Sequence, residues 1–233
     1  MQTLYQHGTL ATLMAGHLEG TATIDEILQH GDSGIGTLTG SDGEVIYLEG
    51  RAFHANEFGE FKALEGNEMT PFSTITRFSA DKTYYAAHEK SDQVFDEILN
   101  NMKSKNLFSA IKITGTFKNM HVRWMPKQEP PYQRLIESAR RQPEKVVPEV
   151  RGTIIGFYTP ELFHGIGASG FHVHFIDEFE SFGGHVLDFE LEVGSIEIQN
   201  FDTFEQHLPS DNQSFLEADI DYNNIGSEIS EAE

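Results

Sequence analysis

Two neighbouring strands are encoded by the stretch that runs from Gly170-Phe171-His172-Val173-His174-Phe175-Ile176-Asp177, through a turn ending in Gly183-Gly184, to the strand that begins with His185. Alternate residues of a β-strand point to the same face, so His172 and His174 lie side by side. A turn at Asp177 to Gly184, which ends in Gly183-Gly184, reverses the chain, and the alternation that follows places His185 on the same, buried face. The stretch therefore predicts an antiparallel hairpin on which three imidazoles converge.

Three neutral imidazoles from adjacent strands are typical of a catalytic zinc site, which leaves coordination positions open for water or substrate. Structural zinc sites are usually closed by four ligands and rich in cysteine, and this chain has no cysteine. We therefore predict that His172, His174 and His185 bind Zn²⁺ or another divalent transition metal. The alternative is that they are buried strand histidines satisfied by hydrogen bonds.

A second interpretation of the same residues is the first metal motif of cupins, because Glu178 follows His174 after three residues. It predicts an iron-dependent dioxygenase with Glu178 in the coordination shell. The second cupin motif is missing, since neither Pro-x-Gly nor a suitably placed Asn follows His185. A module that binds a metal or a small ligand without catalysis is the third possibility.

The overall charge argues against several classes of partner. Sixteen basic and 37 acidic residues give a formal net charge of −21, which repels nucleic-acid phosphates and anionic membranes. The arginines at 134, 140 and 141 lie in a predicted helix, where they form a solvated face. No apolar run approaches the ~20 residues of a membrane span. The first residues, Met1 to His7, lack a secretory signal, so a cytoplasmic location is expected.

The pattern of the whole chain predicts an α+β fold with two domains based on β-sheets and a few packed helices. We expect an N-terminal α+β domain with a mixed sheet at 1–145. A small, mainly antiparallel sheet or barrel at 146–233 would carry the histidines and an acidic tail. The tail from Pro209 is expected to be disordered or to dock.

Hydrophobic periodicity and turn residues give the individual elements. Two short helices are expected in the first thirty residues, the second capped by Thr23 and Glu26. Further helices are expected from Ser91 and at 131–143, and a linker at Pro148. The predicted strands before the histidines are 36–38, 44–48, 52–54, 71–78, 108–114, 116–124 and 153–158.

Several motifs along nearly the whole chain resemble the α-acetolactate decarboxylase family: Gly34-Ile35-Gly36-Thr37, Asp42-Gly43-Glu44, Asn106-Leu107-Phe108-Ser109-Ala110-Ile111, Arg151-Gly152-Thr153-Ile154-Ile155-Gly156-Phe157 and the histidine stretch. The resemblance implies that the three histidines bind zinc. It also implies that Arg123 is the family's essential arginine and that Glu44 is its glutamate after Asp-Gly. A further family glutamate near the C-terminus corresponds to Glu231 or Glu233.

The family reaction implied by this resemblance converts (S)-2-acetolactate, a 2-hydroxy-3-oxo acid, into (R)-acetoin and CO₂. The metal would stabilise an enediolate while Arg123 holds the substrate carboxylate. A glutamate, either Glu44 or the one in the tail, would deliver the proton to C2. Exposed edges of the predicted sheets, together with the resemblance, lead us to expect a homodimer.

Overall fold

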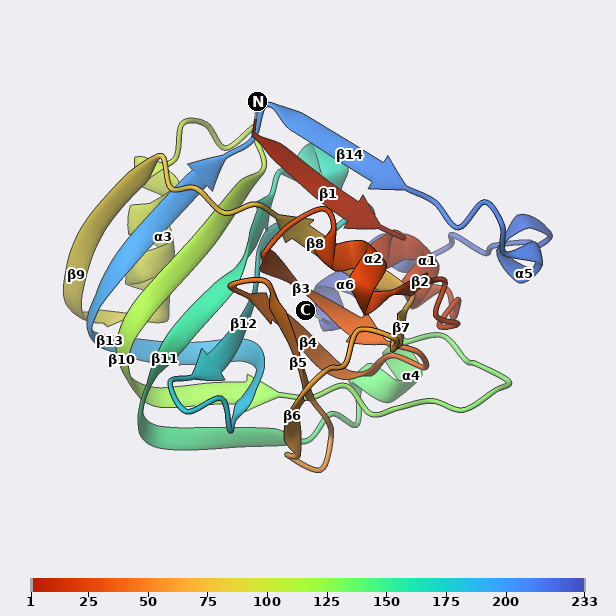
Figure 1. Cartoon of the computed structure of the whole chain (residues 1–233), viewed down its shortest axis with the longest axis horizontal. Helices are drawn as coiled ribbons and strands as arrows, with labels where there is room; N and C mark the ends of the chain where they lie inside the picture. Colours follow the sequence, from red (N-terminus) through yellow and green to blue (C-terminus); the bar gives the residue numbers. More distant parts are fainter. Residues whose placement is uncertain (1, 233) are drawn as a thin grey trace.

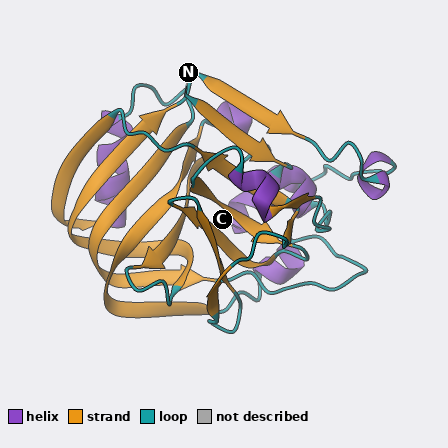
Figure 2. Ribbon diagram, in the orientation of Figure 1, coloured by secondary structure: helices purple, strands orange, loops and turns teal. Residues whose placement is uncertain are grey.

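The computed structural model describes residues 2–232 and is built mainly from β-strands, with a few short helices around them (Figures 1 and 2). The strands form a seven-stranded mixed sheet, a five-stranded antiparallel sheet and a two-stranded sheet of β2 (Ala22–Thr23) and β7 (Met69–Thr70). The predicted combination of two main sheets with few helices is therefore confirmed. No helix within the described residues is long and apolar enough to cross a membrane.

The seven-stranded sheet contains the predicted meander and joins the two ends of the chain. Its only parallel pair within the described residues is β1 with β14, and the other neighbours run antiparallel. The meander predicted at 36–38, 44–48 and 52–54 corresponds to β3, β4 and β5. In spatial order the strands are β14 (Thr203–His207), β1 (Thr3–His7), β8 (Phe72–Thr76), β3 (Ser33–Leu38), β4 (Asp42–Leu48), β5 (Arg51–Ala55) and β6 (Phe61–Ala63).

The second sheet closes on itself, and its long curved strands lie on the left in Figure 1. β10 pairs with both β11 and β13, and β12 pairs with the same two strands, so these four form a ring. β9 adds to the far part of β13. The predicted small antiparallel barrel is thus confirmed. The strands are β9 (Lys82–Lys90), β10 (Ser109–Arg123), β11 (Glu144–Thr159), β12 (Gly170–Asp177) and β13 (Gly183–Asn200).

Three details of the sequence prediction were wrong in this region. Gly115 does not separate two strands but lies inside β10, where a Cβ atom would come within 2.3 Å of the Val193 carbonyl oxygen. Pro148 is not in a linker but inside β11. The helix predicted at 131–143 is reduced to the single turn α4 (Ile136–Ala139). Gly115 and Pro148 lie in strands that pair with distant strands, and local sequence patterns do not encode such pairing.

The predicted domain boundary near residue 145 falls inside β11 and does not separate the two sheets. The closed sheet takes β9 and β10 from the first predicted range and β11 to β13 from the second. The seven-stranded sheet likewise takes β14 from the second range. Each sheet therefore depends on residues from both predicted domains.

The first helices are short and begin at capped residues. At α2 (Ile24–Leu28), the Thr23 hydroxyl accepts from the Glu26 amide at 3.2 Å, and the Glu26 carboxylate accepts from the Thr23 amide at 2.8 Å. This is the predicted capping box, which satisfies amides that have no partner inside the helix. A similar box at Thr9 opens α1 (Leu10–Met14), and the first strand, β1, was not predicted.

The amphipathic helix predicted from Ser91 is α3 (Ser91–Asn101). Val94 and Ile98 are fully buried against the closed sheet, where they share a core with Phe117 and Phe189. The two large sheets pack on each other through a separate core that includes Leu4, Ile35, Ile46, Ile155 and Ile176. This packing brings β4 of the mixed sheet against β12 and β13 of the closed sheet.

The acidic tail docks on the body, one of the two outcomes expected from its composition. It contains α5 (Gln213–Leu216) and α6 (Ile225–Ala232), and α6 packs against α1 and α4 near the centre of Figure 1. Ile225 and Ile229 are buried there. Arg134 fastens the helix, since its guanidinium donates to the Glu228 carboxylate at 2.7–3.2 Å.

Candidate metal centre

Three histidine side chains converge at one end of the closed sheet, as the sequence predicts. The ring centroids of His172, His174 and His185 lie 4.9–5.5 Å from one another. One ring nitrogen of each lies within 4.8 Å of the others, a spacing that can hold a metal ion. Within residues 2–232 no other group of three or more His, Cys, Asp or Glu side chains has this arrangement.

Strand register explains why these side chains meet. His174 of β12 is directly opposite His185 of β13, and His185 is directly opposite Arg123 of β10. Residues opposite each other in paired strands project from the same face, so the three form a row across the sheet. His172, two residues before His174, joins them from the same side of β12. The residues between the histidines, Val173 and Phe175, face the opposite core, as predicted.

The three imidazoles are held in the neutral form that metal coordination requires. Burial, and then the positive charge of Arg123, lowers the pKa of His172 to about 3. Burial is also the main cause of the lowered pKa values of His174 and His185. Each ring therefore keeps a lone pair available at neutral pH.

The orientation of His174 is fixed by a backbone carbonyl and leaves its Nε2 directed at Glu44. Its Nδ1 lies 3.0 Å from the Val45 carbonyl oxygen, which can only accept, so Nδ1 carries the proton and Nε2 the lone pair. The Nε2 atom is buried without a hydrogen-bond partner, and Glu44 Oε2 lies 3.3 Å away. Two acceptors that face each other at this distance need a proton or a cation between them.

This arrangement satisfies the requirements of a divalent metal. A backbone carbonyl on the distal nitrogen of a histidine is a common support for metal ligands, because it fixes both tautomer and ring orientation. Three neutral imidazoles without a thiolate suit zinc and several other divalent transition metals. The residues present therefore fit such an ion, and the histidines are its candidate ligands.

Glu44 and Arg123, predicted from the family resemblance, both line this site. Glu44 lies on β4 of the other sheet, and its Oε1 accepts from the Met125 amide at 3.0 Å. The Arg123 guanidinium donates from Nη2 to His185 Nε2 at 3.0 Å. A metal bound at that nitrogen would use the same lone pair, so it would displace the guanidinium from His185.

The site opens into a pocket that all three histidines, Arg123 and Glu44 line. Its polar lining consists of the histidines, Arg123 and Glu44, and Thr37 and Ser41 add two hydroxyl groups. The rest of the wall is mainly apolar and comes from four different segments. Its apolar side chains are Leu10, Leu13, Phe72, Met125 and Leu135.

Of the other carboxylates predicted for the site, none within the described residues lines this pocket. Glu231 is on α6, where its carboxylate accepts from Arg140 at 2.8 Å, and it does not line the pocket. Glu233 lies outside the described residues. Glu178, the carboxylate of the cupin interpretation, is 3.7 Å from Arg151 and is not part of the histidine group, so the structure does not support that interpretation.

Two kinds of contributor to the site could not be predicted from the sequence. The Val45 carbonyl is a backbone group, which has no signature in the residue type. The apolar wall residues have only the ordinary pattern of a core, so nothing distinguished Leu13 from its buried neighbour Met14.

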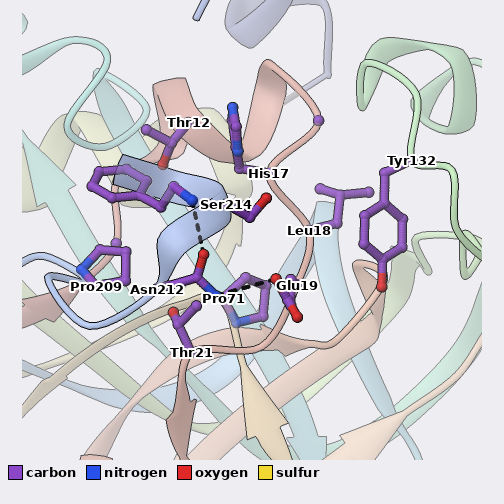
Figure 3. Close-up of a pocket in the computed structure, with 13 residues that line it drawn as sticks. Thr12, His17, Leu18, Glu19, Thr21, Pro71, Tyr132, Pro209, Asn212 and Ser214 are labelled. Carbon is purple, nitrogen blue, oxygen red and sulfur yellow. Dashed lines mark hydrogen bonds between the residues drawn. The ribbon is translucent and has the colours of Figure 1, made fainter. Parts of the chain in front are cut away.

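A second pocket lies beside the tail and contains no comparable group of ligands (Figure 3). It is lined by Thr12, His17 and Glu19 from the N-terminal region, together with Asn212 and other residues of the tail. Asn212 donates to the Glu19 carboxylate at 3.1 Å across it. Its solvated side chains offer no equivalent of the histidine group, so the chemistry belongs to the first pocket.

Comparison with known proteins agrees with this site. The family model described as alpha-acetolactate decarboxylase matches residues 4–222. This chain belongs to the alpha-acetolactate decarboxylase family. The protein named "Alpha-acetolactate decarboxylase" of Lactococcus lactis subsp. lactis (strain IL1403) is 42% identical over 231 residues, which are 99% of this chain and 98% of that protein. The family resemblance noted in the sequence is therefore confirmed.

Solved structures of family members and related proteins have the same fold. One from Staphylococcus aureus, described as a protein of unknown function similar to alpha-acetolactate decarboxylase, has a TM-score of 0.98 at 61% identity, covering 99% of this chain and 100% of that one. The alpha-acetolactate decarboxylase of Bacillus subtilis strain 168 has a TM-score of 0.95 at 34% identity, covering 99% of both chains. The chain is accordingly a carboxy-lyase of the alpha-acetolactate decarboxylase type.

Replacing one ligand should strongly weaken metal binding. We expect His174→Asn to reduce the affinity for Zn²⁺ more than about 100-fold, because loss of a supporting residue alone costs about 10- to 100-fold. Calorimetric titration of chelator-treated protein with Zn²⁺ measures the effect. The matched variant His88→Asn alters an exposed histidine and should bind Zn²⁺ like the parent protein. Equal binding by both variants would show that the metal is held elsewhere.

The metal-free protein should lose stability as the pH falls below about 6.5. Unfolded histidines, with an ordinary pKa of 6.5, then take up protons that buried His172 does not bind until about pH 3. The free energy of unfolding should fall by up to ~1.4 kcal/mol per pH unit for each such histidine.

Urea unfolding between pH 7 and 4, with a chelator present, tests this dependence. The decrease in the free energy of unfolding per pH unit should become smaller in His172→Asn and stay unchanged in His88→Asn. If the free energy of unfolding of His172→Asn depends on pH as strongly as that of the parent protein, the imidazole of His172 is not held neutral in the folded state.

Proposed function

We propose that this protein decarboxylates (S)-2-acetolactate to (R)-acetoin and CO₂, with a divalent metal, most suitably Zn²⁺, on His172, His174 and His185. The observation that supports this best is the convergence of the three neutral imidazoles with Arg123 and Glu44 in one small pocket. Homologues named for this activity match over nearly their full length. The homodimer and the cytoplasmic location expected from the sequence stay predictions.

The substrate is a β-keto acid, and its chemistry defines what the pocket must do. Breaking the bond between C1 and C2 releases CO₂ and leaves an electron pair on C2, which delocalises into the neighbouring ketone. A bound divalent metal would supply a Lewis acid for the oxygens beside that centre. The protein must also hold the carboxylate, exclude water from the developing carbanion and return one proton to C2.

We assign the binding of the substrate carboxylate to Arg123. It is a buried cation in a protein of net charge −21, and the overall field would otherwise repel an anionic substrate. A guanidinium can hold a carboxylate through two parallel hydrogen bonds, which fixes its orientation as well as its position. The direction of the breaking bond would thereby be set relative to the ketone.

We assign the delivery of the proton to Glu44. One of its oxygens is fixed by the Met125 amide, and the other lies 3.3 Å from the lone pair of His174. A carboxyl group held in this way presents its proton from one direction only. Protonation of C2 from one face yields a single enantiomer of acetoin.

The activity is tested by giving the zinc-loaded protein racemic 2-acetolactate without oxygen and measuring acetoin. We expect rapid formation from one enantiomer, loss of activity with a chelator, and a decrease of at least about 100-fold in His172→Asn but not in His88→Asn. Formation no faster than the spontaneous rate, although Zn²⁺ is bound, would refute the proposal. Oxygen consumption by an iron-loaded sample would instead favour a dioxygenase.

The role of Glu44 is tested by the stereochemistry of the product. In Glu44→Gln the rate should fall by about 100- to 10,000-fold, the usual contribution of a general acid, and the remaining acetoin should approach a racemate. Chiral chromatography measures the enantiomeric ratio. The matched variant Glu49→Gln, outside the pocket, should keep both rate and ratio. A slow variant that still forms a single enantiomer would assign the proton to another group.

A further inference from the structure

The pocket is lined by polar groups and by a set of apolar side chains, here called the apolar wall, which has no assigned role in the chemistry described above. The polar groups are the histidines, Arg123, Glu44 and two hydroxyls. Two of the apolar side chains, Leu10 and Leu13, come from the short helix α1. They are three residues apart, so they project from the same side of the helix.

Helix α1 is held firmly at this position. The Leu10 amide donates to the Ile166 carbonyl oxygen at 3.0 Å, and the Ala11 amide donates to that of Gly165 at 2.8 Å. The capping box of Thr9 and Thr12 satisfies its first turn. Movement of α1 away from a larger ligand would break both of these hydrogen bonds to the loop at Gly165 and Ile166.

The C-terminal helix supports the same wall from behind. Leu10, Leu13 and Leu135 belong to one core cluster with Ile225 and Ile229 of α6. These two isoleucines are 5% and 0% exposed, so the leucines pack against side chains that are themselves buried. The ion pair of Arg134 with Glu228 keeps α6 in contact with it.

We propose that Leu13, with Leu10 beside it, determines which alkyl group the enzyme accepts on C2 of a 2-hydroxy-3-oxo acid. This inference depends on the proposed function. The carboxylate, hydroxyl and ketone of the substrate match the polar side of the pocket, so its alkyl substituents face the apolar side. The fixed wall accommodates the methyl group of 2-acetolactate and discriminates against the ethyl group of 2-aceto-2-hydroxybutanoate.

The test compares kcat/KM for these two substrates in Leu13→Ala and in Met14→Ala. Both residues are on α1 and belong to the same core cluster, but Met14 does not line the pocket. One methylene in an apolar pocket changes kcat/KM by about 10- to 200-fold. We therefore expect Leu13→Ala to raise the ratio of kcat/KM for the ethyl substrate to kcat/KM for the methyl substrate at least about tenfold. Met14→Ala should leave this ratio unchanged.

The outcomes separate this inference from the proposed function. An unchanged ratio in Leu13→Ala, or equal changes in both variants, would refute the role of Leu13, whereas acetoin formation by the parent protein in the same assay would still support the proposed function. Failure of the parent protein to form acetoin would refute the proposed function itself. If Leu13→Ala does not fold, Leu13→Val makes the same comparison with a smaller expected rise, and Leu13→Met, which conserves volume, should restore the parental ratio.

Discussion

The closure of the four-stranded ring is the constraint on which the rest of this structure depends. Because β10 pairs with β13 as well as with β11, Arg123 lies directly opposite His185, which in turn lies opposite His174. A shift of one residue in either pairing would turn these side chains to the opposite face. The ring therefore fixes the Arg123 guanidinium and the imidazoles of His185 and His174 in one row through strand pairing alone.

The mixed sheet completes the site by packing against this ring. β4 supplies both the Glu44 carboxylate and the Val45 carbonyl, which fixes the tautomer of His174. Burial is the main cause of the lowered pKa values of all three histidines, and the positive charge of Arg123 lowers them further. The contact between the sheets thus determines the protonation states on which metal binding depends.

The helices contribute to the apolar lining of the pocket and to its support. α1 presents leucines to the pocket, while α6 packs behind them and is held by Arg134. These segments lie more than 200 residues apart in the chain, at its two ends. The tail that looked weakly structured in composition is therefore part of the support of the active site.

The sequence alone was sufficient for the local features. The alternation around His172 and His174 and the capping box at Thr23 each depend on residues close in the chain, and each is found in the structure. The predicted reversal before His185 is also present, but Gly183 and Gly184 are paired residues of β13 and not part of the turn. The family motifs also identified Arg123 and Glu44, which line the pocket. Only the tertiary structure determined the uninterrupted β10 through Gly115, the crossing of the expected boundary by β11 and the apolar wall. These features arise from pairing and packing between residues far apart in sequence, and local pattern carries no record of which distant partner a strand or a leucine will meet.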